Sequence, residues 1–260
     1  ILAQHAESYR KIRNTFRFIL GNIQDNFEQQ SLESLDIKKF NELEQYILHK
    51  LFALYGSVKE NFKNYNFHKL YKELLNFCSL DLSSFYFDIR KDVLYCDNVN
   101  SKKRKDCIIV LNVILDCLLK WFAPIFVFTT DEIYTLVSKD TKNIHEQTFT
   151  DLPKNWENNI LDKKWKHLFK IKQEANIAIE AKRASKEIGS SLEVDLIISL
   201  NEKLFKITEN IDFSELCITS DAKIKKTESD NVTVVTTKAE GEKCTVCWKI
   251  SKNGCERHPV

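Results

Sequence analysis

The sequence predicts a mainly α-helical protein, a helical bundle followed by a small α+β domain. Over residues 1–188 apolar side chains recur at three- and four-residue steps, the spacing of one helix face. Over 192–200 they alternate strictly, as in a half-buried strand. The 260 residues include only 5 Gly and 3 Pro, too few for a fold built on tight turns. We therefore expect domains at 1–188 and 189–260, with the boundary near Gly189.

The first predicted helix, at 6–25, carries two stripes. Its apolar stripe is expected to face a core and comprises Tyr9, Ile12, Phe16, Ile19, Leu20 and Ile23. Its polar stripe lies opposite and comprises Arg10, Arg13, Asn14, Arg17, Gly21 and Gln24. Guanidinium groups pair with phosphate and an amide can bond a base edge, so the polar stripe is a candidate RNA surface. The alternative is an ordinary solvated helix face.

The remainder of the first domain is expected to be helical after a polar loop at 25–36. Apolar periodicity predicts helices at 43–65, 70–95 and 108–122. The basic run at 102–105 is interpreted as the solvated start of the last of these, with an RNA phosphate contact as the alternative. Pro124 ends that helix, and Thr129 with Glu132 has the spacing of a capping box for a short helix through Val137.

The C-terminal part changes character along its length. The polar segment 143–159 is expected to be a linker, and a long helix follows from Leu161 to Gly189. Strands are then predicted at 192–200, 216–219 and 232–237.

Composition narrows the function classes. The formal net charge is +2, from 39 basic and 37 acidic residues, so we expect neither DNA nor a membrane as partner, and any RNA site must be a local patch. No apolar run reaches the roughly 18 residues of a bilayer span. The chain has eight cysteines, and those such as Cys78, Cys107 and Cys117 that lie in apolar helical patterns indicate a reducing compartment, the cytoplasm. The sequence starts with Ile and contains no Met, which predicts a piece of a longer protein.

No catalytic residues are predicted. The five glycines stand far apart, so no phosphate-binding loop is present, and no nucleophile-His-acid arrangement has a local signature. One cluster suggests a metal: Cys244 and Cys247 can bind one Zn²⁺ from a tight turn. A structural zinc takes four ligands, and Cys255 with His258 has the spacing to complete the set. The alternative for this second pair is two surface residues in a frayed tail.

Several segments resemble isoleucyl-tRNA synthetases, in the order of that family. AESYRKIRNTFRFILGN resembles the helix that follows the catalytic core, and NYNFHKLYKELLNFCSLDLSSFYFDIRKDVLY and WFAPIFVFTTDEIY are similar to two later segments. KEIGSSLEVDL resembles the join to the C-terminal domain, and KCTVCW the start of the zinc knuckle. The helical anticodon-binding domain is shared with valyl-, leucyl-, cysteinyl- and methionyl-tRNA synthetases, but the last two segments favour the isoleucyl branch.

The resemblance implies a part of a class I synthetase that binds the anticodon stem and loop of isoleucine tRNA. The catalytic core, which binds ATP, is missing, so this piece is expected to be inactive by itself and monomeric. By position, Arg10, Arg13, Asn14 and Arg17 match the helix that faces the anticodon. Trp248 matches the aromatic residue beside the knuckle, which either stacks on a loop base or plugs the knuckle.

Two further points follow from the resemblance. The family closes its knuckle with a second cysteine pair after His-Pro, which is absent before Val260, so zinc is implied for the intact protein rather than for this piece. The competing interpretations are a free-standing RNA-binding or helical interaction module, and the equivalent domain of a valyl-, leucyl- or methionyl-type synthetase.

Overall fold

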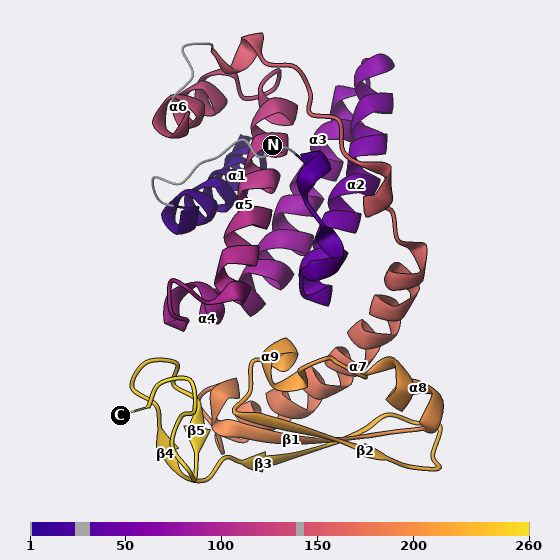
Figure 1. The fold of residues 1–260 in the computed structure, drawn as a ribbon, viewed down its shortest axis with the longest axis vertical. Helices are drawn as coiled ribbons and strands as arrows, with labels where there is room; N and C mark the ends of the chain where they lie inside the picture. Colours follow the sequence, from indigo (N-terminus) through magenta and orange to yellow (C-terminus); the bar gives the residue numbers. More distant parts are fainter. Residues whose placement is uncertain (1, 24–31, 139–142, 260) are drawn as a thin grey trace. The chain divides into compact units, whose positions relative to one another are not determined.

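The structure is a computed structural model that describes residues 2–23, 32–138 and 143–259. The predicted polar stripe position Gln24 and most of the predicted loop at 25–36 lie outside these ranges. The chain forms two compact units, Ile1–Asn158 and Asn159–Val260. The first is helical and the second is a small α+β unit, as the sequence predicts for the fold class (Figure 1).

The first unit is built from six α-helices within the described ranges. They are α1 (Leu2–Ile23), α2 (Glu42–Lys63), α3 (Phe67–Asn76), α4 (Phe87–Cys96), α5 (Lys102–Phe122) and α6 (Val127–Val137). A π-helical segment, Phe77–Tyr86, joins α3 to α4 without a break, so the helix predicted at 70–95 is confirmed as one continuous rod. Within it the Ser83 and Ser84 hydroxyls each donate to a carbonyl five residues earlier, at 2.8 Å.

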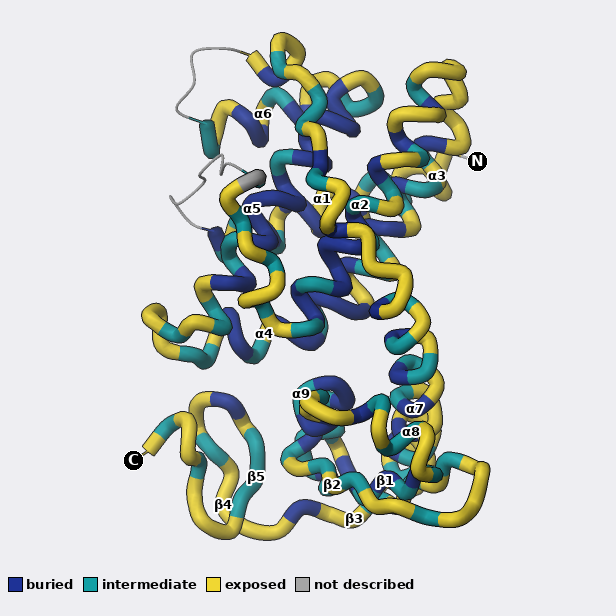
Figure 2. The backbone as a smooth tube through the Cα atoms, turned by 45° about the vertical axis from the view of Figure 1, so that its right-hand side comes forward, coloured by how far each residue is buried: buried dark blue, intermediate teal, exposed yellow. Residues whose placement is uncertain are grey.

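The core of this unit surrounds α5. Helices α1, α2, α4 and α6 all contact α5, whose side chains are buried almost all round because the sequence is apolar on every face (Figure 2). The apolar stripe of α1 is buried as predicted at Ile12, Phe16, Ile19 and Ile23. In the described ranges no helix combines the length and the apolar character that crossing a bilayer requires.

A buried ion pair ties α2 to α4. The Arg90 guanidinium donates to the Glu44 carboxylate through Nε at 2.5 Å and through NH2 at 2.7 Å. The Tyr86 hydroxyl donates to the same carboxylate at 3.2 Å. Because Glu44 and Arg90 are almost fully buried, separating α2 from α4 would leave an uncompensated charge in the core. Sequence periodicity did not indicate it.

The second unit places helices on one face of a three-stranded sheet. Its elements are α7 (Asn159–Ala184), β1 (Val194–Leu200), α8 (Glu202–Ile207), α9 (Phe213–Cys217), β2 (Asp221–Lys226) and β3 (Thr233–Lys238). The strand order is β2-β1-β3, with β2 parallel and β3 antiparallel to β1. Alternate residues of β1 are buried toward α7 and α8, which confirms the predicted half-buried strand. A short hairpin, β4 (Glu242–Lys243) and β5 (Ile250–Ser251), follows.

One strand prediction is wrong. Residues 216–219 do not form a strand, because Asp212 Oδ1 accepts from the backbone N–H groups of Ser214 and Glu215 and so caps the short helix α9. Ile218 then ends α9 with a left-handed φ of +57°. The parallel neighbour of β1 is instead β2, whose lysines mask the alternation in the sequence. The strand predicted at 232–237 is confirmed as β3.

The end of α7 also differs from prediction. Lys186, at φ +60°, ends the helix rather than Gly189. The Glu187 N–H donates to the Lys182 carbonyl and the Lys186 N–H to the Arg183 carbonyl, which is a Schellman motif formed without glycine. An ion pair of 2.6 Å between Lys182 and Glu187 supports the same turn.

The boundary between the compact units lies at Asn158, whereas the sequence predicted a change of domain near Gly189. Helix α7 belongs to the second unit because it packs on β1, β3, α8 and α9. The polar segment before it is not a bare linker: Trp156 is fully buried, and the Asn158 N–H donates to His49 Nδ1 at 2.9 Å. The segment is therefore part of the first unit.

Candidate functional site

The candidate RNA surface is the polar stripe of α1. Arg10, Arg13, Asn14 and Arg17 are all exposed, on the side of α1 opposite its buried stripe. These four residues of the predicted stripe thus face solvent. Their side chains differ in the hydrogen bonds and ion pairs that they make.

Arg13 is held by α6. Its guanidinium donates to both oxygens of Glu132, NH1 to Oε2 at 3.1 Å and NH2 to Oε1 at 3.3 Å. The hydrogen bond to Glu132 is the main reason that the pKa of Arg13 is raised. Beside it the Tyr9 and Thr129 hydroxyls lie 2.8 Å apart. The capping box predicted for Thr129 and Glu132 is therefore wrong, because both lie inside α6 and face α1.

The other stripe residues have fewer restraints. Arg10 pairs within its own helix, with Glu7 at 2.5 Å. In the described part of the chain no hydrogen bond or ion pair is made by the side chain of Asn14 or Arg17. These two side chains therefore keep their donors available for a ligand.

The basic run at 102–105 is used at the start of α5. Lys102 Nζ donates to the Lys39 carbonyl at 2.7 Å and pairs with Asp106, and Arg104 NH1 donates to the Asp97 carbonyl at 2.8 Å. Ser101 caps the helix by accepting from the Arg104 N–H. The run is confirmed as the start of a helix, and Lys102 and Arg104 are engaged there.

The candidate metal centre is a Cys3His cluster in and after the β4–β5 hairpin. One ligand atom from each of Cys244, Cys247, Cys255 and His258 lies within 4.8 Å of all the others. The Cys247 and Cys255 sulfurs are 3.6 Å apart, and His258 Nδ1 lies 3.5 Å from Cys244 Sγ and 3.4 Å from Cys255 Sγ. Tetrahedral Zn²⁺ would separate two sulfurs by about 3.8 Å and a sulfur from a nitrogen by about 3.6 Å. The donor set and its spacing therefore fit zinc.

The pKa values of the thiols show why a cation suits this cluster. Backbone N–H groups, first that of Cys247, lower the pKa of Cys244 to about 6. Burial first, and then the neighbouring sulfurs, raise the pKa of Cys247 to about 12. Near neutral pH the Cys244 thiolate therefore forms readily, whereas burial opposes the ionised form of Cys247. A bound divalent ion would stabilise the thiolate form of its cysteine ligands.

Trp248 follows the second cysteine in a left-handed conformation, at φ +64°. The backbone N–H of Trp248 donates to the Cys244 carbonyl at 3.0 Å, so the turn that brings the thiols together also positions the indole. The side chain is 58% exposed, with Lys243 Nζ 5.4 Å from the ring centroid. The indole is therefore largely open to solvent rather than enclosed by the knuckle.

Sequence reasoning missed Glu132, which orients Arg13. Their contact joins residues 119 positions apart, so no local pattern signals it. It left open whether Cys255 and His258 join the first cysteine pair, and the fold brings all four residues together.

Comparison with known proteins gives one family and a set of close relatives. The family described as "Anticodon-binding domain of tRNA ligase" matches residues 44–198. The isoleucine–tRNA ligase of Pelagibacter ubique is 60% identical over 258 residues, 99% of this chain and 28% of that protein. The enzymes of the same name from Agrobacterium fabrum and Bartonella henselae are 35% and 36% identical over 96% and 97% of this chain. The chain spans 27% of the length of each of these two.

Proposed function

Because the chain belongs to the family of anticodon-binding domains of tRNA ligases, we propose that it binds the anticodon stem and loop of an isoleucine tRNA. It would do so as part of an isoleucine–tRNA ligase. The synthesis of the aminoacyl adenylate from ATP would then belong to the remainder of that enzyme. The chain by itself should show no isoleucine-dependent exchange of pyrophosphate into ATP.

The observation that supports RNA binding most directly is the stripe of α1. The whole chain is close to neutral, at +2, so attraction to phosphate must come from a concentrated patch. Arg17 and Asn14 keep their donors available, and Glu132 holds the Arg13 guanidinium in a defined orientation. A pre-oriented guanidinium loses less conformational entropy on binding phosphate. Trp248 supplies a second contact, an exposed ring on which a loop base can stack.

Charge-matched substitutions test the stripe. Arg17→Gln should weaken binding of isoleucine tRNA and lower the slope of log affinity against log salt by about one. Lys105→Gln removes one positive charge from an exposed residue of the run at 102–105 and should change both quantities much less. Fluorescence anisotropy at several salt concentrations measures both, and a tRNA with an exchanged anticodon tests specificity.

Equal binding by the two variants would contradict the assignment of the stripe. Equal affinity for tRNAs with the isoleucine anticodon and with an exchanged one would instead favour a general RNA-binding module. Absence of tRNA binding by the unmodified chain would favour a structural scaffold.

For the cluster at the C-terminus we propose a structural zinc held by Cys244, Cys247, Cys255 and His258. Bound zinc would neutralise the thiolates and lock the turn that carries Trp248. The four residues come from the β4–β5 hairpin and the turns that follow it, so the ion would order a segment with little apolar burial.

Elemental analysis of the purified chain tests this ligand set. We expect about one zinc per chain, as for a closed four-ligand site. Cys255→Ser and His258→Ala should each lower the zinc content strongly, whereas Cys96→Ser, in α4, should not. Zinc retained by both ligand variants would exclude this set.

Two broader properties complete the proposal. None of the eight cysteines is in a disulfide in the described part of the chain, which supports a reducing compartment, the cytoplasm.

A monomer is the proposed oligomeric state, and light scattering of the purified chain tests it.

A further inference from the structure

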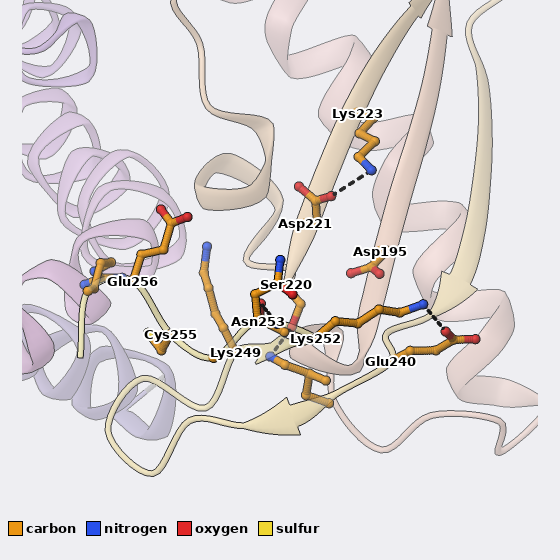
Figure 3. A pocket seen from close by; sticks show the side chains of 14 residues that line it. Asp195, Ser220, Asp221, Lys223, Glu240, Lys249, Lys252, Asn253, Cys255 and Glu256 are labelled. Atoms are coloured by element: carbon orange, nitrogen blue, oxygen red, sulfur yellow. Dashed lines mark hydrogen bonds and ion pairs between the residues drawn. The ribbon is translucent and has the colours of Figure 1, made fainter. Parts of the chain in front are cut away.

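The Cys3His cluster lies beside a polar pocket of about 660 Å³ in the second unit. The pocket is bounded by one end of the sheet, at Asp195 and Asp221, and by the segment that follows β5 (Figure 3). Cys255 belongs to that segment, lines the pocket and is partly exposed. A small molecule in solution can therefore approach Cys255 through the pocket.

The neighbour of Cys255 within the cluster is a second thiol. The Sγ atoms of Cys255 and Cys247 are 3.6 Å apart, and Cys247 is buried, at 5% exposed. A disulfide requires the two sulfurs to approach to about 2.05 Å. Side-chain rotation can supply this movement because few residues of the segment 242–259 are buried. The pair thus combines an accessible thiol with a shielded one that lies within reach.

The cysteines outside the cluster are placed differently. Four of them are buried, which shields a thiol from oxidants: Cys78, Cys107, Cys117 and Cys217. Cys96 is partly exposed, but it ends α4 in the first unit, away from the cluster in the second. The cluster is therefore the place where an accessible cysteine has a second thiol beside it.

We propose that the cluster is a site of reversible oxidation, at which a hydroperoxide converts Cys247 and Cys255 into a disulfide and zinc is released. The inference rests on the proposed zinc site and adds a modification to it. Disulfides of a reducing compartment are typically transient and serve redox sensing, in agreement with a bond that forms only on exposure to peroxide.

The reaction balances with one peroxide for each pair of thiolates. The Cys255 thiolate attacks a peroxide oxygen, the O–O bond breaks, and Cys255 sulfenic acid and hydroxide form. The Cys247 thiolate then attacks the Cys255 sulfur, so the S–S bond forms and a second hydroxide leaves. Both hydroxides take up a proton to become water, and two electrons have passed from the thiolates to the peroxide. The cluster loses two of its four ligands, so it no longer retains the ion.

The test uses the full 260-residue chain loaded with zinc, and hydrogen peroxide as the oxidant. A chromogenic chelator should report release of about one zinc per chain. Trypsin cleaves after Lys243, Lys249, Lys252 and Arg257, which separates peptide 244–249 from peptide 253–257. A disulfide between Cys247 and Cys255 links these two peptides, whereas one between Cys244 and Cys247 stays within the first. Mass spectrometry with fragmentation should find the linked pair, and dithiothreitol should separate it.

Two variants sharpen this result. Cys255→His keeps four zinc ligands but cannot form the disulfide, so peroxide should release its zinc several times more slowly. Cys96→Ser removes the partly exposed cysteine outside the cluster and should release zinc as the unmodified chain does.

Peroxide treatment of the zinc-loaded chain that gives no linked peptides would overturn the inference and leave the zinc site intact. Zinc release from Cys255→His at the rate of the unmodified chain would also overturn it. If that variant does not bind zinc, the peptides of the unmodified chain decide alone. A purified chain that cannot be loaded with zinc would contradict the zinc site itself, and this inference with it.

Discussion

The helical first unit and the C-terminal hairpin region, residues 242–259, are stabilised by different means. The first unit buries large side chains such as Trp121 and Trp156 and encloses the Glu44–Arg90 pair. In the hairpin region Cys247 is the one buried residue of the described positions. Apolar burial stabilises the first, while the second has too little of it to order a chain. The hairpin region therefore has no apolar core of its own among the described positions, and the proposed zinc would supply its order instead.

The largest expected effect is therefore produced by removing metal. A structural zinc contributes about 10 kcal/mol or more to the order of its ligand loop. Chelation should abolish amide-exchange protection across 242–259, while the helical circular dichroism signal stays unchanged. Hydrogen exchange with mass spectrometry measures the first, and readdition of zinc is the control. Loss of the helical signal on chelation would show that the two regions are not stabilised independently.

The second experiment destabilises the helical unit instead of the hairpin region. Glu44→Gln leaves the Arg90 guanidinium buried without its counter-ion, which should lower the free energy of unfolding by about 3 to 5 kcal/mol. Urea titration followed by circular dichroism measures it. Glu7→Gln, which breaks the exposed pair with Arg10, should change it little. Zinc content should be the same in both variants; a loss of zinc in Glu44→Gln would remove the contrast between the regions.

A smaller effect concerns the turn that ends α7. Lys186 has a left-handed backbone conformation, which is unfavourable for every residue with a side chain. Lys186→Gly should therefore raise the free energy of unfolding by about 0.5 to 1 kcal/mol. Thermal unfolding measures it. The same substitution at Lys163, inside α7, should lower stability by about 1 kcal/mol. Destabilisation at both positions would show that the Lys186 side chain matters more than its φ.

The smallest effect is the pH dependence of Asp195. Burial and Asp221 raise its folded pKa above the unfolded value, so its ionisation destabilises the fold. Near neutral pH the melting temperature of the unmodified chain should thus be slightly lower than that of Asp195→Asn. This difference in melting temperature should disappear as the pH falls below about 4. A gap that widens on acidification would mean that the Asp195 carboxylate stabilises the fold.

Periodicity located the long helices and β1 because each buries a regular face, which leaves a local record in the chain. It failed where local and tertiary signals disagree. Leu216 and its neighbours are apolar enough for a strand, but the Asp212 cap makes a helix of them. The β2 strand escaped prediction because its solvent side is lysine-rich and its inner side is only half buried.

The sequence by itself determined the fold class, the outward stripe of α1 and the chemistry of the cysteine cluster. These depend on helical spacing and on the identity of donor atoms, which are local properties. Only the tertiary structure decided that Glu132 orients Arg13, that Cys255 and His258 join the first cysteine pair, and that Asp195 stands beside Asp221. The physical reason is common to all three. The local sequence around a polar side chain does not indicate its partner, because the packing of other residues brings the two together.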